Sequence, residues 1–219
     1  MRIGVISDIH ANKIAFDAVL AAMPPVDQIV CAGDVVGYNP WPTACINRIR
    51  QESIPAVMGN HDRAVSAGTQ FRFGGQAAAG VEYTMTQLDS DAIEWLGGRP
   101  TTRTLLDNRV KIVHGHPDDP DRYTYPSEFT QSMLDTEEVL ITGHTHVQGH
   151  KIFNDGIVMN PGSVGQPRDG DPDAAFSVVD LDDWSVKQQR VSYDIDAVVE
   201  SVRETTLPDQ IGERLYDGR

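Results

Sequence analysis

The chain of 219 residues predicts a mixed α/β domain in which helices lie outside two sheets. Short runs rich in Val and Ile, each bounded by Gly or polar residues, have the form of buried strands. Helical patterns separate the early runs, and hairpin signals separate the later ones. We expect a single domain over residues 1–219, a length sufficient for one well-buried core.

Five apolar runs form the predicted strands of the first two thirds of the chain. In order they are RIGVIS (2–7), DQIVCAG (27–33), IPAVMG (54–59), VKIVHG (110–115) and EVLITG (138–143). Apolar residues at helical spacing predict helices over 11–23 and 42–53, and Pro42 suits a helix start. The stretch 76–97 predicts one or two further helices.

The last third predicts antiparallel strands. Asn154-Asp155-Gly156 lies between two apolar runs, which is a hairpin signal. Residues 174–194 predict a second hairpin that turns at Asp182-Asp183. A helix is expected from Ile195 to Thr205, with Asp194 as its N-cap.

Charge restricts the partners that this surface can attract. The net charge is −14, with 23 Asp, 9 Glu, 14 Arg and 4 Lys. Such a surface repels polyanions, so we expect no extended nucleic-acid binding. The Asp excess suggests adaptation to high salt, where screening makes self-repulsion tolerable; a generic acidic surface is the equal alternative.

The location predicted from the sequence is the cytoplasm. No segment approaches the roughly 18 apolar residues of a membrane helix. The opening MRIGVIS enters an apolar run at once and leaves no room for a secretory signal. Cys31 and Cys45 are expected to be small buried hydrophobes rather than part of a disulfide framework.

Polar side chains follow all five early runs at the point where each run ends. They are Asp8 and His10; Asp34; Asn60, His61 and Asp62; His114 and His116; and His144 and His146. Ligands of open α/β sheets bind beyond the carboxyl ends of the strands, so we expect one shared crevice. We expect the pairs Asp8/His10 and His144/His146, each two residues apart, to project to the same side while the backbone stays extended.

Each of these positions also has an ordinary structural interpretation. A single Asp after a strand is usually a helix N-cap, GNHD alone is a turn, and a single His is more often structural. Coincidence at five strand ends argues against these interpretations, because six of the seven histidines fall there.

The ligand types predict a metal centre. Carboxylate, imidazole and one amide oxygen, without thiolate, suit Mn²⁺, Fe, Co, Ni or Zn rather than a structural cysteine zinc site. There are more candidate ligands than one ion needs. We therefore expect two divalent ions that share a carboxylate, roughly 3.5–4 Å apart.

In these residues the sequence resembles the calcineurin-like metallophosphoesterases, and most closely their small prokaryotic phosphoesterases. The resemblance rests on five ordered blocks, DIH, GDVVGY, GNHD, HGHP and GHTH, and on the later loop NPGSVGQPRDG (160–170). It implies a four-layer α-β-β-α sandwich of two mixed sheets flanked by helices. It also implies two metal ions, with Mn²⁺ expected first.

Residue by residue, the resemblance implies a ligand set and a catalytic histidine. One ion takes Asp8, His10 and His146, the other takes Asn60, His114 and His144, and Asp34 bridges them. A bridging water acts as the hydroxide nucleophile. His61 is not a ligand; it lies over the substrate and stabilises the phosphoryl charge or protonates the leaving oxygen.

Some assignments keep two interpretations. Asp62 either orients His61 or caps a helix, and Arg168 either binds the substrate phosphate or forms a structural salt bridge. Arg63 has the same two interpretations as Arg168. His116 stands where the resemblance leads us to expect Ser or Thr, and it either donates a hydrogen bond to a metal ligand or is a polar loop residue. The segment Ala64 to Gln76, with Phe71, Arg72 and Phe73, is a lid or a subunit contact in a homo-oligomer.

The function predicted is hydrolysis of phosphodiesters or small phosphomonoesters, with a small phosphorylated substrate as the partner. The alternative within enzymes is a phosphoprotein or dinucleoside-polyphosphate phosphatase. The alternative of another class is a scaffold or regulatory binding module on the same fold. Loss of metal ligands would favour the scaffold, whereas every expected ligand position is filled here.

Overall fold

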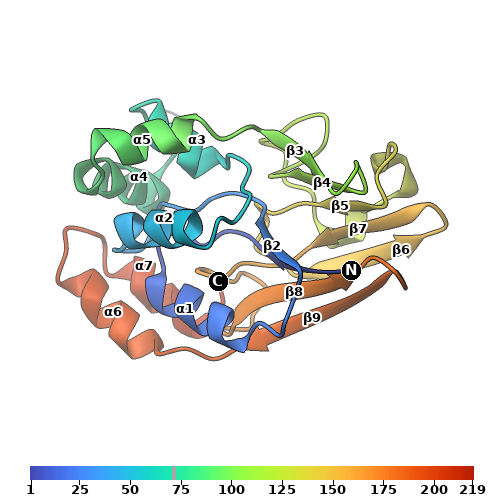
Figure 1. Cartoon of the computed structure of the whole chain (residues 1–219). Coiled ribbons are helices and arrows are strands. Elements are labelled where there is room, and N and C mark those ends of the chain that lie inside the picture. Colours follow the sequence, from blue (N-terminus) through green and yellow to red (C-terminus); the bar gives the residue numbers. More distant parts are fainter. Residues whose placement is uncertain (71–72) are drawn as a thin grey trace.

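Two stacked sheets form the centre of the protein in a computed structural model that describes residues 1–70 and 73–219 (Figure 1). The first sheet has the order β2-β1-β8-β9. Its strands are β1 (Arg2–Ile6), β2 (Gln28–Cys31), β8 (Ala174–Asp180) and β9 (Ser185–Val191). Strands β1 and β2 run parallel, whereas β8 is antiparallel to both β1 and β9.

The second sheet has the order β3-β4-β5-β7-β6. Its strands are β3 (Thr102–Leu105), β4 (Val110–Val113), β5 (Val139–Ile141), β6 (Gly149–Phe153) and β7 (Gly156–Asn160). Strands β4, β5 and β7 are parallel, and the edge strands β3 and β6 are antiparallel to their neighbours. Both predicted hairpins, β6–β7 and β8–β9, are confirmed.

An apolar core joins the two sheets. Side chains from both inner faces are fully buried against one another, including Ile3, Val30, Ile112, Ile141 and Ile157. Burial of this kind is the main stabilising contribution in a layered α/β fold.

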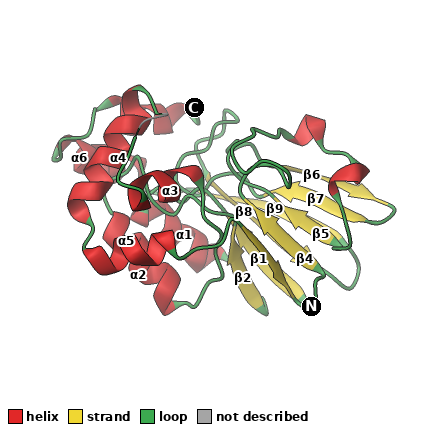
Figure 2. Ribbon diagram, turned by 90° about the horizontal axis from the view of Figure 1, so that it is seen from above, coloured by secondary structure: helices red, strands yellow, loops and turns green. Residues whose placement is uncertain are grey.

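Helices cover the outer face of the first sheet (Figures 1 and 2). A second cluster joins them to it, with Phe16, Ile46 and Leu96 from helices and Ile6 and Phe176 from strands. The helices are α1 (Lys13–Ala22), α2 (Pro42–Gln51), α3 (Asn60–Ser66), α4 (Gly75–Gln87), α5 (Ser90–Gly97), α6 (Ile195–Arg203) and α7 (Gln210–Glu213), followed by the 3₁₀ turn η3 (Arg214–Asp217).

Two short 3₁₀ helices cover the outer face of the second sheet. They are η1 (Pro126–Glu128) and η2 (Gln131–Met133), and Phe129 and Met133 pack on Leu140 and Val158 of the sheet. The predicted four layers, two mixed sheets flanked by helices, are therefore confirmed, with the fourth layer built from 3₁₀ turns and loop.

Local signals placed most elements correctly. Pro42 is at the start of α2, and the Asp194 side chain accepts the Ala197 N–H as the N-cap of α6. The predicted strand 54–59 is wrong as a strand: only Ala56 bridges, to Cys31. Residues 54–59 lead directly into α3, which begins at Asn60. The Met58 N–H is donated to the Pro100 carbonyl rather than to a neighbouring strand.

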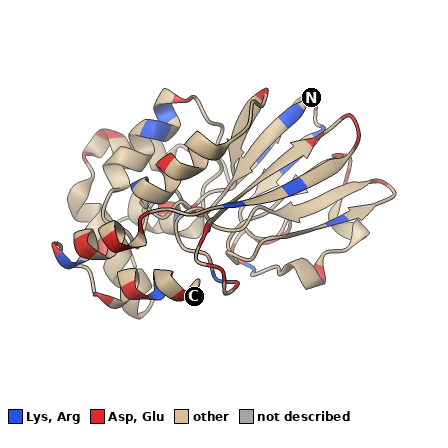
Figure 3. Ribbon diagram, turned by 90° about the horizontal axis from the view of Figure 1, so that it is seen from below, with Lys and Arg blue, Asp and Glu red and all other residues tan. Residues whose placement is uncertain are grey.

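The acidic residues are spread over helices and loops (Figure 3). Within the described residues, no helix is both long and apolar enough to cross a membrane. Phe71 and Arg72, part of the predicted lid or contact segment, lie outside the described residues.

Candidate metal centre

The carboxyl ends of four strands, two from each sheet, meet at one edge of the sandwich. Asp8 follows β1, Asp34 follows β2, His114 follows β4 and His144 follows β5. Asn60 joins them from the first turn of α3. The predicted convergence of strand ends therefore occurs, and it draws on both sheets rather than on one.

The backbone at five of the candidate ligands is left-handed, not extended as predicted for Asp8/His10 and His144/His146. The φ angles are 53° at Asp8, 47° at His10, 51° at Asp34, 68° at His144 and 59° at His146. This conformation is unfavourable for residues with a Cβ and persists only where the surroundings hold it. The chain thus turns sharply after β1, β2 and β5, and the turn directs the ligand side chain back toward the shared site.

Backbone hydrogen bonds hold these turns. The Asp8 and His10 N–H groups are donated to the Gly33 and Asp34 carbonyls, at 2.9 and 3.0 Å. The His144 N–H is donated to Asp8 Oδ2 at 3.1 Å, and the His61 N–H to Asp34 Oδ1 at 2.8 Å. The loops after different strands are therefore tied to one another through the carboxylates themselves.

Two glycines are required by close approach. A Cβ added at Gly59 would overlap the Asp34 carboxylate, and one at Gly143 would overlap Ser7 Oγ and approach Asp8 Oδ2. Neither position leaves room for any side chain, because the atoms displaced would belong to buried polar groups of the site.

One group of three candidate ligands comprises Asp8, His10 and His146, all buried. The two histidine Nε2 atoms are 3.1 Å apart, and His146 Nε2 lies 3.3 Å from Asp8 Oδ1. Two ligands of one ion with bonds of about 2.0–2.2 Å are themselves separated by about 3–3.6 Å. The group has the spacing of a coordination shell.

A second group comprises Asp34, His114 and His144. His114 Nε2 lies 3.3 Å from Asp34 Oδ2 and 3.1 Å from Asn60 Oδ1. His10 Nε2 lies 3.8 Å from the same Asp34 oxygen, so the Asp34 carboxylate stands between the two groups.

Carbonyl groups fix the orientation of three imidazoles. The Nδ1–H groups of His10, His114 and His146 are donated to the carbonyls of Val36, Ala32 and Gln166, at 3.0, 2.7 and 2.6 Å. Each bond directs Nε2 into the site, which is how ligating histidines are usually oriented. His144 donates Nε2–H to the Asp121 carbonyl at 3.2 Å, so Nδ1 keeps its free lone pair.

The loop 160–170 braces the site from outside. Asn160 donates to the Gly143 carbonyl and to Thr145 Oγ1, at 2.7 and 3.0 Å, and holds the GHTH turn. Ser163 Oγ donates to the Asp8 carbonyl at 2.7 Å. The NPGS sequence therefore serves as support for two ligand loops.

The donor set fits divalent metal ions. Asp8 Oδ1 is fully buried and receives no hydrogen bond from the described residues, a costly arrangement for a carboxylate unless a cation faces it. The donors are carboxylate, imidazole and amide oxygen, with neither Cys31 nor Cys45 among the candidate ligands. Such a set excludes a structural cysteine zinc site.

Electrostatics prepare most of these histidines for ligation. Burial lowers the pKa of His10, His144 and His146, the second of these to about 4, and keeps the rings neutral. Burial also disfavours the charged form of His114, but the adjacent Asp34 carboxylate prevails and raises its pKa to about 10. A cation at that position must displace the His114 proton.

His61 lies at the edge of the first group. Its ring contacts those of His10, Tyr38 and Phe73, with centroids 4.8, 4.8 and 4.6 Å away. Burial lowers the pKa of His61 to about 4, and its Nδ1 has no hydrogen-bond partner in the described part of the chain. One His61 nitrogen lies within 4.8 Å of candidate ligand atoms of His10 and Asp34, so these three residues form a third group with ligand spacing. The non-ligand role of His61 stays a prediction.

The contacts of Asp62 are those of a helix cap. Its carboxylate accepts the Gly59 N–H at 3.1 Å and the Val36 N–H at 3.2 Å. Burial and the nearby Asp34 charge raise the pKa of Asp62 to about 7. The alternative, that it orients His61, is not what these bonds provide.

Arg168 is held by neutral partners. It donates to Gln166 Oε1 at 2.7 and 3.2 Å and to Tyr38 Oη at 3.2 Å, and its guanidinium lies 5.6 Å from the Tyr38 ring centroid. Together with Asp34, His61 and His146, it lines a cavity of about 200 Å³, named here the phosphoryl pocket. The predicted structural salt bridge is absent among the described residues.

Arg63, His116 and Tyr123 lie in or beside the same site. Arg63 pairs with Asp121 beside the ligand groups. His116 is part of a tight turn with Asp119, and its Nδ1 accepts the Asp118 N–H at 3.2 Å, so it belongs to the loop. Tyr123 also lines the phosphoryl pocket; no motif or periodicity in the sequence indicated it.

Residues 1–183 match the family model for the calcineurin-like phosphoesterase superfamily domain. The chain is 30% identical over 239 residues to an uncharacterized protein of Methanocaldococcus jannaschii, with 99% of this chain and 98% of that protein covered. It is 26% identical to the phosphodiesterase YfcE of Escherichia coli, over 85% of this chain and 91% of that protein.

Solved structures agree in fold. A crystal structure of a metallophosphoesterase from Sphaerobacter thermophilus is similar at a TM-score of 0.87 and 32% identity, covering 100% of this chain and 99% of that chain. A hypothetical protein from Pyrococcus horikoshii is equally similar in fold, at a TM-score of 0.87 and 21% identity, with 100% and 98% covered.

Proposed function

We propose a specific activity for this chain, which belongs to the calcineurin-like phosphoesterase superfamily, a family of metal-dependent hydrolases of phosphoester bonds. We propose that it hydrolyses phosphodiesters or small phosphomonoesters at a centre of two divalent ions. Asp8, His10 and His146 hold one ion; Asn60, His114 and His144 hold the other; Asp34 is shared.

The observation that carries the proposal is the position of Asp34. Its Oδ2 atom lies 3.3 Å from His114 Nε2 and 3.8 Å from His10 Nε2, which belong to different ligand groups. A carboxylate at that position can contribute an oxygen to each of two ions. Mn²⁺ is the ion we expect, since the carboxylate and amide oxygen donors suit it; the imidazoles suit Fe, Ni and Zn as well.

The residues around the ions bind and orient the phosphoryl group. When bound, two divalent ions supply Lewis-acid polarisation and lower the pKa of a water molecule. Arg168 lines the phosphoryl pocket and offers a guanidinium to the substrate oxygens. His61, kept neutral by burial, donates an N–H to the phosphoryl group, so we favour charge stabilisation over proton donation.

The size of the phosphoryl pocket and the net charge of the whole protein support a small substrate. The phosphoryl pocket has a volume of about 200 Å³, and the protein carries a net charge of −14. A long polyanion would meet that charge over a large surface, whereas a small ester meets mainly the local cations. The relative named as a phosphodiesterase supports ester hydrolysis of the same kind.

The test is hydrolysis of bis(p-nitrophenyl) phosphate and p-nitrophenyl phosphate by protein stripped with a chelator. The assay is repeated after Mn²⁺ is restored, in molar KCl. We expect turnover to depend on restored Mn²⁺, and the ratio of the two rates gives the preference for diester or monoester. Stripped protein supplied with Ca²⁺ is the control, because Ca²⁺ prefers oxygen ligands over imidazole.

Two outcomes would contradict the proposal. Full turnover by stripped protein would exclude the metal centre as the catalyst. No turnover of either ester with Mn²⁺ demonstrably bound would favour the scaffold alternative or a substrate such as a phosphoprotein.

A further inference from the structure

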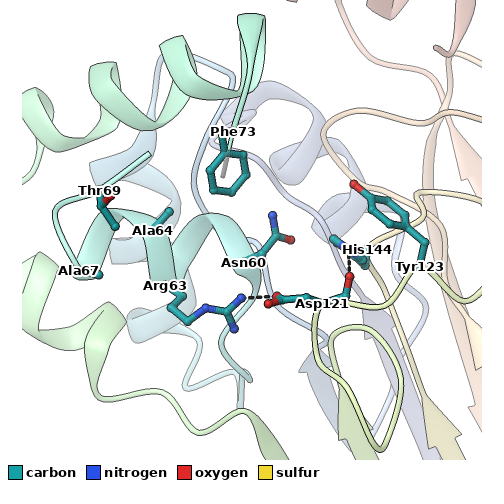
Figure 4. A pocket seen from close by; sticks show the side chains of 9 residues that line it. All are labelled: Asn60, Arg63, Ala64, Ala67, Thr69, Phe73, Asp121, Tyr123 and His144. Atoms are coloured by element: carbon teal, nitrogen blue, oxygen red, sulfur yellow. Dashed lines mark hydrogen bonds and ion pairs between the residues drawn. The ribbon is translucent and has the colours of Figure 1, made fainter. Parts of the chain in front are cut away.

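A second cavity adjoins the phosphoryl pocket. It has a volume of about 460 Å³ and shares Asn60, Phe73, Tyr123 and His144 with that pocket (Figure 4). Cavities of roughly 300–1,000 Å³ hold drug-sized ligands. A group attached to a phosphate bound over the ligand clusters can therefore extend into this space, named here the side cavity.

Two aromatic rings frame the side cavity, and each contacts a residue of the site. Tyr123 stacks on His144, with ring centroids 3.9 Å apart and planes at 27°. Phe73 contacts His61 at 4.6 Å between centroids. Tyr123 is 50% exposed, so much of its surface is available to a ligand beside the ligand clusters.

Among the described residues, the rest of the wall consists of small side chains and one ion pair. Ala64 and Ala67 line one side, and the Arg63–Asp121 ion pair lies at the edge opposite Phe73 (Figure 4). The charges of Arg63 and Asp121 offset each other at this edge. The pair still presents donors and acceptors together, which suits the polar edge of a planar ring.

We propose that the side cavity binds a planar aromatic substituent of the phosphate ester, stacked against Tyr123 and Phe73, with the Arg63–Asp121 pair at its edge. This inference rests on the proposed function and specifies its substrate class: phosphate esters of an aromatic alcohol or of a nucleoside. Stacking on aromatic side chains contributes about 1–3 kcal/mol per base, or roughly 5- to 150-fold in affinity.

The test compares two phosphonates that cannot be hydrolysed at the P–C bond and differ in the aromatic ring. Dissociation constants of phenylphosphonate and methylphosphonate are measured by calorimetry on the full chain loaded with Mn²⁺. We expect wild-type protein to bind phenylphosphonate about tenfold more tightly. The ratio of the two constants is the readout, since effects on the phosphoryl pocket cancel in it.

Variants assign that ratio to the cavity. We expect it to fall toward one in Tyr123→Ala and in Phe73→Ala, and to remain near the wild-type value in Tyr123→Phe. Tyr125→Ala is the matched control, because Tyr125 is a neighbouring tyrosine of similar exposure, 45%, that does not line the side cavity. A nucleoside phosphonate distinguishes a nucleoside substituent from a simple aromatic one. Binding tighter than that of phenylphosphonate, and lost in Arg63→Met, indicates a nucleobase.

The results that overturn the inference differ from those that overturn the proposed function. A wild-type ratio near one, or an equal loss in Tyr125→Ala and Tyr123→Ala, excludes an aromatic subsite while the phosphoryl site stands. Failure of the Mn²⁺-loaded protein to bind either phosphonate overturns the phosphoryl site itself, and the inference with it.

Discussion

The core between the sheets and the ligand clusters at their edge are both buried, yet they differ in backbone conformation and in the polarity of the side chains that they bury. Ile3, Val30 and Ile157 in the core lie on regular strands and pack apolar surface. Asp8 and His144 at the edge lie on left-handed backbone and bury groups that carry or accept charge.

The difference separates what stabilises this fold from what makes it act. The core lowers the free energy of the native state by removing apolar area from water. The clusters cost stability, through left-handed backbone and buried polar atoms, unless cations occupy them. Substitutions in the two regions should therefore have opposite signatures: stability without chemistry in one, chemistry and metal in the other.

The largest effect is expected for Asp34→Asn. Removing the shared negative charge should weaken both ions together, by more than about 100-fold in affinity, and abolish turnover. Metal content after equilibrium dialysis is the measurement. Asp62→Asn is the matched control, a buried carboxylate held by backbone N–H groups, and should keep both ions. Unchanged metal content in Asp34→Asn would disprove the shared role.

His61→Ala should separate chemistry from metal binding. We expect both ions to remain while kcat falls by about 10²–10³-fold, the usual cost of removing one donor that stabilises charge in the transition state. Metal analysis and steady-state kinetics with bis(p-nitrophenyl) phosphate check this together. His116→Ala, in the loop turn, is the control and should behave like wild type. Loss of an ion in His61→Ala would instead make His61 a ligand.

Ile157→Ala tests the core side of the comparison. The cavity left between the sheets should cost about 2–5 kcal/mol in the free energy of unfolding. The folded fraction should still bind metal normally, since Ile157 lies at the amino end of β7, away from the ligand edge. Denaturant unfolding and metal content are measured on one sample. Metal loss from folded protein would show that the two regions are not separable.

The smallest effect expected concerns the acidic surface. If it is adapted to high salt, molar KCl should raise the midpoint of thermal unfolding by at least about 2–4 °C, equivalent to about 1 kcal/mol for a chain of this size. Sucrose at matched osmolarity is the control for exclusion effects. A midpoint that stays constant or falls with KCl would favour a generic acidic surface.

The sequence predicts those parts of the molecule that depend on local pattern. Val- and Ile-rich runs located β1, β2, β4 and β5, and polar residues after them located the ligand edge. Turn signals such as Asn154-Asp155-Gly156 located the hairpins. These features depend on neighbours in the chain, which the sequence displays directly.

Other features arise only from contacts between distant segments. The left-handed backbone of Asp8 and His144 depends on hydrogen bonds to loops that follow other strands, and an alternating pattern cannot reveal them. Tyr123 stacks on His144 from a loop without periodicity. The run 54–59 has strand composition, but the turn into α3 limits it to one bridge.

The central claim is that two ions share Asp34. The most direct measurement is the number of Mn²⁺ ions bound per chain by wild-type protein, counted by mass spectrometry after exhaustive dialysis against buffered Mn²⁺. The account predicts two ions per chain, and the second should leave together with the first in Asp34→Asn. One ion per chain, or none, would contradict it.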